Sequence, residues 1–211
     1  MKKLALMLSI LLLGLAVAVP GARAKPQRKK KMPKPYRQAG FKEARFTCEV
    51  PADWKELPRD QEEDAEEKIY EVVVAGPKGK EGIAPLISAS YYAPGNMDFD
   101  DAGQYLKVHQ DPGLNTIEGQ KTSKPQKTLV AGKPATAFSH DTFEYYPPRS
   151  IKTKEIKMRE DHVVLAHGRG FFALKLAVPA AEHKRWRPAF DHVLKTFRPA
   201  KPDAQGKKKH P

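Results

Sequence analysis

The sequence predicts a single α/β domain, an antiparallel β-sheet covered by helices, with a tail at each end. The clearest strand spans 171–178, where alternate residues are apolar and share one face of an extended chain: Phe172, Leu174, Leu176 and Val178. After Pro179, large apolar residues recur every three or four positions, which aligns them along one side of a helix: Trp186, Phe190, Val193, Leu194 and Phe197. Several more strand patterns, joined by short turns, favour antiparallel pairing in one sheet with helices on its faces.

The first half of the domain is expected to contain three strands and one helix. The strands are rich in β-branched and aromatic residues and span 45–50, 68–75 and 85–92, with a glycine-rich loop at 76–82. The helix is expected to begin with Asp98 as its N-cap and to end before the Asp111-Pro112-Gly113 turn. Its apolar face would contain Phe99, Ala102, Tyr105, Leu106 and His109.

The second half is expected to be mostly strand. The predicted strands span 126–130, 133–146, 153–166 and 171–178, and turns that contain glycine or proline separate them. The closing helix contains Pro188, which lacks a backbone donor. We therefore expect this helix either to kink at Pro188 or to begin there.

Residues 1–24 have the pattern of a secretory signal peptide. Lys2 and Lys3 precede an apolar run over 4–19, and Ala22-Arg23-Ala24 places small residues at the −3 and −1 positions of a cleavage site after Ala24. The apolar run is shorter than the roughly 20 residues that cross a bilayer, which favours cleavage over a membrane anchor. The mature protein is therefore expected to be periplasmic or secreted, without a transmembrane anchor.

The excess positive charge lies in two terminal segments rather than in the domain. Residues 41–200 contain 24 Lys or Arg and 24 Asp or Glu, whereas 25–40 contain seven basic residues and no acidic one. Both 25–40 and 201–211 have too little apolar surface to offset the entropy of ordering, so we expect a basic disordered arm and a basic disordered tail. The neutral domain gives no specific signal for nucleic acid.

The arm and the tail allow two interpretations. They either aid solubility without binding anything, or they contact an anionic surface such as lipid headgroups, cell-wall polymer or nucleic acid. In the second case the contacting residues would be Lys25, Arg28, Lys29, Lys30, Lys31, Lys34, Arg37, Lys207, Lys208 and Lys209.

We find no catalytic, cofactor or metal motif, and we expect no enzyme activity, no cofactor and no bound metal. Nucleophile elbows, phosphate-binding loops and dinucleotide-binding glycine patterns are absent from the sequence. The single cysteine, Cys48, shares the parity of the apolar residues in its strand, so it is expected to be buried. His162 and His167 would face opposite sides of a strand and are not expected to chelate a metal. The same holds for His183 and His192 on a helix, and all four are expected at exposed or half-buried positions.

Two further features leave alternatives open. The run 60–67 contains six acidic residues in eight without calcium-loop spacing, so a solvated acidic loop is favoured over docking of a basic tail, a weak cation site or a basic partner. The adjacent tyrosines 91–92 and 145–146 must face opposite ways in a strand. Core or helix-covered positions are favoured for them over an exposed partner patch.

Three segments carry a resemblance to a known family. An early strand runs into a proline and a tryptophan in FTCEVPADW (46–54), and Gly132 precedes a strand that ends in FEYY (143–146). The strand GFFAL (170–174) precedes the closing amphipathic helix. These residues resemble the PsbP-like family over most of 41–200. The resemblance implies an α/β/α sandwich with an antiparallel central sheet, and non-enzymatic binding to a larger partner.

These observations predict four regions: a signal peptide (1–24), the basic arm (25–40), a PsbP-like domain (41–200) and the basic tail (201–211). The expected function is that of an exported, non-enzymatic binding or accessory module of the bacterial cell envelope, with an envelope protein as its partner. The alternative is a binder of an anionic surface that acts through the arm and the tail.

Overall fold

The computed structural model of the chain describes residues 36–40, 46–59, 61–110 and 119–200. The strands are β1 (Tyr36–Ala39), β2 (Phe46–Pro51), β3 (Lys55–Glu56), β4 (Ile69–Ala75), β5 (Leu86–Tyr92), β6 (Lys121–Thr122), β7 (Gln126–Val130), β8 (Lys133–Tyr146), β9 (Lys154–His167), β10 (Gly170–Pro179) and β11 (Arg198–Pro199). The helices are α1 (Gln61–Glu67), α2 (Ala102–Gln110), the 3-10 turn η2 (Ala180–Glu182) and α3 (His183–Thr196).

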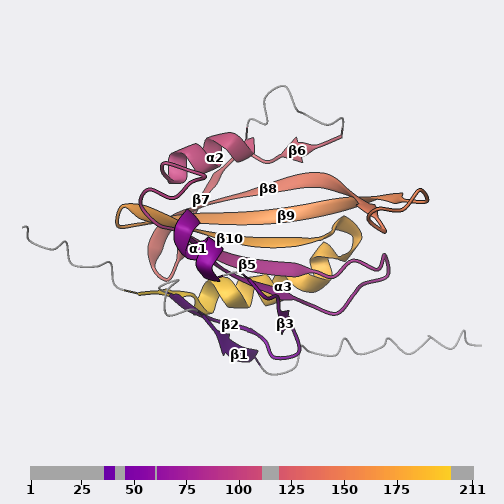
Figure 1. The fold of residues 1–211 in the computed structure, drawn as a ribbon, viewed down its shortest axis with the longest axis horizontal. Helices are drawn as coiled ribbons and strands as arrows, with labels where there is room; N and C mark the ends of the chain where they lie inside the picture. Colours follow the sequence, from indigo (N-terminus) through magenta and orange to yellow (C-terminus); the bar gives the residue numbers. More distant parts are fainter. Residues whose placement is uncertain (1–35, 41–45, 60, 111–118, 201–211) are drawn as a thin grey trace, which may run out of the picture. The chain divides into compact units, whose positions relative to one another are not determined.

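An eight-stranded antiparallel sheet is the central element (Figure 1). Its strand order is β3-β4-β5-β10-β9-β8-β6, and β7 also pairs with β8. The strand read most clearly from the sequence, β10, pairs with β9 on one side and β5 on the other, so it lies in the middle of the sheet. The expected antiparallel sheet is confirmed.

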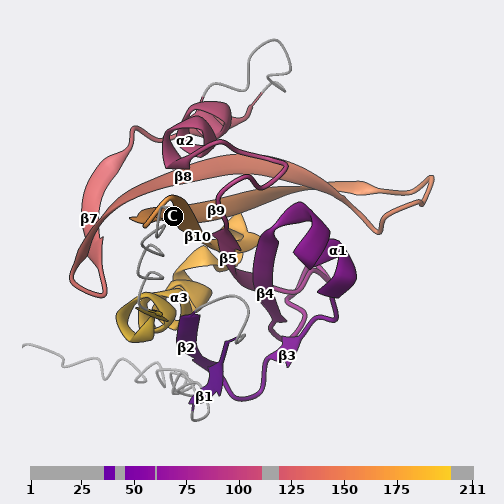
Figure 2. The same cartoon turned by 60° about the vertical axis from the view of Figure 1, so that its left-hand side comes forward.

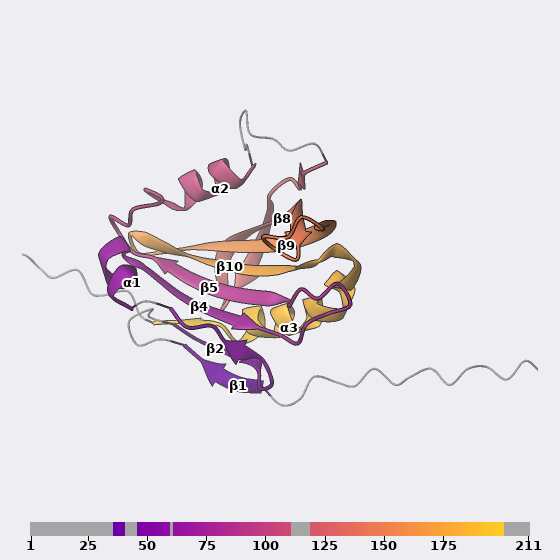
Figure 3. The same ribbon diagram turned by 45° about the vertical axis from the view of Figure 1, so that its right-hand side comes forward.

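The two faces of this sheet are covered differently (Figure 2). Helix α2 packs on one face, which we call the α2 face. Helix α3 and a small sheet of order β1-β2-β11 pack on the other, which we call the α3 face (Figure 3). This is the sandwich of helices about an antiparallel sheet that the sequence predicted.

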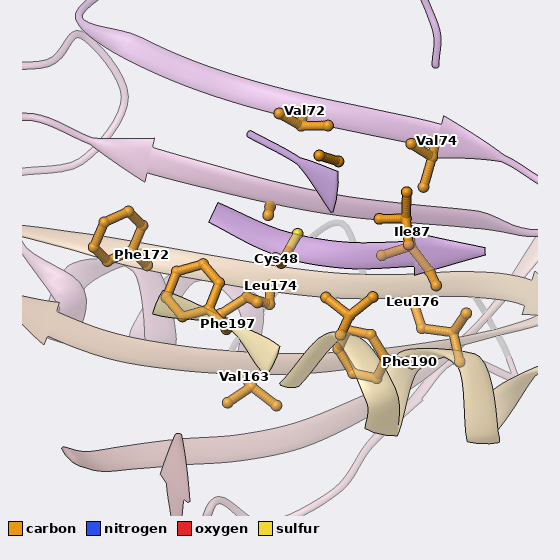
Figure 4. Packing of buried hydrophobic residues seen from close by; sticks show 14 of the residues in the cluster. Cys48, Val72, Val74, Ile87, Val163, Phe172, Leu174, Leu176, Phe190 and Phe197 are labelled. Carbon is orange, nitrogen blue, oxygen red and sulfur yellow. The ribbon is translucent and has the colours of Figure 1, made fainter. Parts of the chain in front are cut away.

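The main hydrophobic core lies on the α3 face (Figure 4). The alternating residues of β10 point into it, and Phe172, Leu174 and Leu176 have no exposed surface. The stripe of α3 meets them through Phe190, Val193 and Phe197, with Trp186 and Leu194 partly buried beside it. Each large side chain buried in this way contributes up to about 1.5–3 kcal/mol to the free energy of folding. The predicted pairing of strand and helix is therefore the centre of the core.

The basic arm was expected to be disordered up to Gly40, and this expectation is wrong for its last residues. Tyr36–Ala39 form β1, which pairs with β2 so that Ala39 lies opposite Cys48. Tyr36 also stacks on His192 of α3, with ring centroids 3.5 Å apart. The next strand along the chain supplies these backbone partners, which composition does not reveal. Residues 25–35, the tail 201–211 and the predicted signal peptide lie outside the described residues.

The predicted start of α2, and one of the two alternatives given for the closing helix, are also wrong. Helix α2 begins at Ala102 rather than after Asp98, because the Asp101 carboxylate accepts a hydrogen bond from the backbone N–H of Gln104 at 2.8 Å and caps the helix there. Helix α3 begins at His183 rather than at Pro188. Pro188 therefore lies inside the helix, where its ring removes one backbone hydrogen bond.

The acidic run 60–67 was expected to be a loop, but residues 61–67 form helix α1. Glutamate and alanine are good helix formers, so this composition supports a short helix that packs beside β4. None of the helices in the described part of the chain is long and apolar enough to cross a membrane.

Candidate binding cleft on the open half of the α2 face

Helix α2 covers only part of its face of the sheet. It packs through Tyr105 on a cluster that contains Phe138, Val164 and Phe171. Beyond this cluster the same face forms a cleft of about 620 Å³. Its polar lining residues are Glu71, Ser88, Thr142, Glu144, Glu160 and Lys175, and its apolar ones include Val73, Ile83, Leu86, Tyr146, Met158 and Ala177.

The strand register brings the polar groups of the floor together. Lys175 of β10 lies opposite Ser88 of β5 on one side and opposite His162 of β9 on the other. Glu160 is two residues before His162, so both side chains point to the same face. Residues from three strands thus place a hydroxyl, an ammonium group, a carboxylate and an imidazole in neighbouring positions.

Two half-buried carboxylates of the cleft, Glu160 and Glu71, have partners from the chain itself. Glu160 accepts a hydrogen bond from Nε2 of His162 at 3.1 Å, and Nζ of Lys175 lies 3.9 Å from its other oxygen. Burial alone would raise the pKa of Glu160, but His162 and Lys175 outweigh it and lower that pKa. Glu71 forms an ion pair with Arg59 and accepts a hydrogen bond from Ser90 at 2.7 Å. Both carboxylates are therefore paired with basic side chains of the same chain.

A second polar contact connects the cleft to α2. The Tyr105 hydroxyl lies 3.0 Å from Nδ1 of His162, whose side chain is 1% exposed. Burial lowers the pKa of His162 and raises the pKa of Tyr105 well above its usual range. At neutral pH, Tyr105 and His162 are therefore uncharged and Glu160 is ionised.

One wall of the cleft is the loop between β4 and β5. The Glu182 carboxylate holds this loop by accepting a hydrogen bond from the backbone N–H of Lys80 at 2.8 Å. It also accepts one from Nε1 of Trp186, in α3, at 3.1 Å. A Cβ atom at Gly79 would collide with Glu182, so the loop approaches the carboxylate as closely as it does only because residue 79 is glycine. The loop wall is thereby attached to the start of α3.

Of the predicted anionic-surface contacts, only Arg37 lies among the described residues. It is part of β1, donates to the carbonyl oxygen of Trp54 at 3.3 Å and lies 3.7 Å from the Glu56 carboxylate. Arg37 is thus engaged in holding β1 to its neighbours. Lys25, Arg28, Lys29, Lys30, Lys31, Lys34, Lys207, Lys208 and Lys209 lie outside the described residues, so their role stays a prediction.

The histidine predictions are partly confirmed. His162 and His167 do face opposite sides of β9, because His162 contacts Tyr105 of α2 whereas the His167 ring lies 5.0 Å from Phe172 in the α3-face core. Both are buried, however, and the expectation of exposed or half-buried positions is wrong for them. Within the described ranges, no three His, Cys, Asp or Glu side chains are close enough to share a metal ion.

The cysteine prediction is confirmed, and the prediction of core or helix-covered tyrosines is confirmed for Tyr91 and Tyr92 but wrong for Tyr145. Cys48 is buried in the α3-face core, and burial raises the pKa of its thiol to about 12. Tyr91 is buried on the α3 face, whereas Tyr92 stacks on Phe171 under α2. Tyr145 is 58% exposed and Tyr146 lines the cleft.

Sequence reasoning missed the cleft itself. A signal was present, because Lys175 interrupts the apolar strand 171–178 and Ser88 and Ser90 interrupt 85–92. Polar residues at period-two positions of buried strands mark a face that is not fully covered. Their convergence depends on strand order, which the sequence pattern does not specify.

No family model matches the chain, and no curated protein matches it. Among solved structures, the chain is similar to the Ran-binding protein Mog1p of Saccharomyces cerevisiae, at 9% identity and a TM-score of 0.47, over 80% of this chain and 97% of that one. It is also similar to PsbP (CyanoP) of Synechocystis, at 10% identity and a TM-score of 0.47, over 78% of this chain and 92% of that one.

A further match is LpqN of Mycobacterium tuberculosis, described as involved in cell envelope biogenesis, at 19% identity and a TM-score of 0.40, over 78% of this chain and 84% of that one. The chain is similar in structure to PsbP-like proteins.

Proposed function

We propose that this protein is an exported, non-enzymatic binding module of the cell envelope that holds part of a protein partner in the cleft on its α2 face. The observation that carries the proposal is the cleft itself. A depression of about 620 Å³ on the antiparallel sheet, with apolar walls and a few polar groups on its floor, has the size and lining of a ligand-binding site.

The chemistry of the floor favours binding over catalysis. Glu160 and Glu71 are paired with cations of the same chain, and a general base would need a carboxylate free to accept a proton. The imidazole of His162 is buried beside the cleft, under α2, with both nitrogens in hydrogen bonds. Cys48 belongs to the opposite face, with a thiol pKa of about 12, so it cannot serve the cleft as a nucleophile.

The proposal is tested by capture of a partner from an envelope extract at about 0.3 M salt, where exposed charge contacts are strongly screened. The bait is the mature chain and, beside it, a shortened chain of residues 33–200, which keeps β1 and removes most of the basic arm and the whole tail. Ala177→Trp fills the cleft. Ala166→Trp is the matched control, because Ala166 is an exposed alanine of the same face that does not line the cleft.

The expected result is one partner that the mature chain, the shortened chain and Ala166→Trp retain and that Ala177→Trp loses. Retention by Ala177→Trp would overturn the role of the cleft. Loss of all capture on shortening the chain, or on raising the salt, would instead support the alternative of an anionic-surface binder that acts through its arm and tail.

A further inference from the structure

A chain of buried polar contacts connects α2 to the floor of the cleft. Tyr105 is the buried residue of α2, and its hydroxyl lies 3.0 Å from Nδ1 of His162. The other nitrogen, Nε2, lies 3.1 Å from the carboxylate of Glu160, which lines the cleft. His109, one turn after Tyr105, stacks on the Tyr105 ring with centroids 4.0 Å apart and lies 5.3 Å from the His162 ring.

The direction of each hydrogen bond follows from its partners. The Glu160 carboxylate can only accept, so Nε2 of His162 carries the hydrogen. Nδ1 is then the acceptor, and the Tyr105 hydroxyl donates to it. Among the described residues, that hydroxyl has no second hydrogen-bond partner. If Nδ1 became protonated, the Tyr105 hydrogen would lose its acceptor inside a buried contact between α2 and the sheet.

The groups around His162 disfavour a positive charge on its imidazole ring. Lys175 of β10 and His140 of β8 both lower the pKa of His162, and burial lowers it further, whereas only Glu160 raises it. His109 of α2 is also held neutral by burial and by Lys175. Glu71 of β4 acts on the same cluster through Tyr105. The ring of His162 stacks on Phe138 at 4.5 Å, so water does not reach it from β8.

We propose that the Tyr105–His162–Glu160 chain is a pH-sensitive latch that holds α2 on the sheet at neutral pH and releases it in mild acid. Release exposes His162 to water, where an imidazolium ion is stable, and uncovers the apolar cluster of Phe138, Val164 and Phe171 beside the cleft. Below the ordinary histidine pKa, opening becomes more favourable by up to about tenfold for each unit by which the closed state lowers the pKa of His162. The latch is independent of whether the cleft binds a partner.

The test is amide hydrogen exchange of the mature chain near pH 7.5 and about pH 5, with rates corrected for the intrinsic effect of pH. We expect the protection of 102–110 to fall about tenfold or more in acid, while that of β10 stays constant. His162→Gln keeps an acceptor for Tyr105 and a donor for Glu160 but does not titrate, so its α2 should lose the pH dependence. His192→Gln removes a histidine of α3, on the other face of the sheet, and should keep the wild-type pH dependence of α2.

Three results would overturn the latch: equal α2 protection at both pH values, an acid effect that persists in His162→Gln, or a parallel loss in β10 that reports global unfolding. If His162→Gln does not fold, an NMR titration of the wild-type protein tests the proposal instead. It must place the pKa of His162 below its ordinary 6.5. Titration at or above that value would contradict the proposal. Tyr105→Phe, which removes only the hydroxyl, should lower α2 protection at neutral pH.

Discussion

Arg187 of α3 donates a hydrogen bond to the carboxylate of Asp161 on β9 at 2.7 Å, and the Asp161 side chain is only 6% exposed. The same carboxylate oxygen lies 2.6 Å from Nε2 of His183, at the start of α3. Arg159 approaches the other oxygen at 3.3 Å. One buried carboxylate therefore joins the closing helix to the central sheet.

Replacing that carboxylate should destabilise the fold. Asp161→Asn removes the charged acceptor of His183 and of Nη1 of Arg187, and we expect the free energy of unfolding to fall by about 1.5–3 kcal/mol, measured by urea denaturation. Asp191→Asn is the matched control, because Asp191 also binds Arg187 but is 55% exposed, and it should cost less than about 0.5 kcal/mol. Equal losses for the two variants would contradict a special role for Asp161.

Protonation of Asp161 should also lower the stability of the fold in acid. Burial would raise the pKa of Asp161, but the hydrogen bonds from His183 and Arg187 outweigh it and lower the pKa below the ordinary 3.8. A carboxyl pKa that is lower in the folded state stabilises the fold above the unfolded-state value, and this stabilisation disappears as the pH falls through the folded-state value. Urea denaturation should show a loss below about pH 4 that is shallower in Asp161→Asn.

The thiol of Cys48 should be unreactive in the folded protein. It is 3% exposed, and burial raises its pKa to about 12, so the thiolate fraction near pH 8 is negligible. A chromogenic disulfide reagent should modify no thiol in the native protein and one thiol per chain in urea. Rapid modification without denaturant would show that the small sheet opens readily from the core.

The loop wall of the cleft should depend on Glu182. Glu182→Ala removes the acceptor for the backbone N–H of Lys80 and for Nε1 of Trp186, and we expect trypsin to cut after Lys78 or Lys80 several-fold faster. Glu182→Gln keeps an acceptor oxygen of the same length and should resemble the wild type. If neither variant changes the cleavage rate, the loop is held by its backbone hydrogen bonds at Gly76 and Gly79 instead.

Local patterns were enough to find most elements but not their ends. Alternation in β10 and the apolar stripe of α3 are properties of consecutive residues, so both were predicted with the correct faces. The sequence predicts Asp98 as the N-cap of α2, and two further acidic residues, Asp100 and Asp101, follow it closely. The choice of Asp101 depends on the Asn96 side chain, which accepts from the backbone N–H of Phe99 at 2.8 Å and forms a separate turn before the helix.

The sequence by itself determined which residues are apolar, how they repeat and where the charge lies, and this was sufficient for the antiparallel sheet, its helical cover and a buried Cys48. Only the tertiary structure decided that Tyr36–Ala39 join a strand, that His162 is buried against Tyr105, and that Glu160, Lys175 and Ser88 share one cleft. Apart from the pairing of β1 with β2, these are contacts between residues far apart in the chain. They depend on strand order and register, which a local pattern of hydrophobicity does not encode.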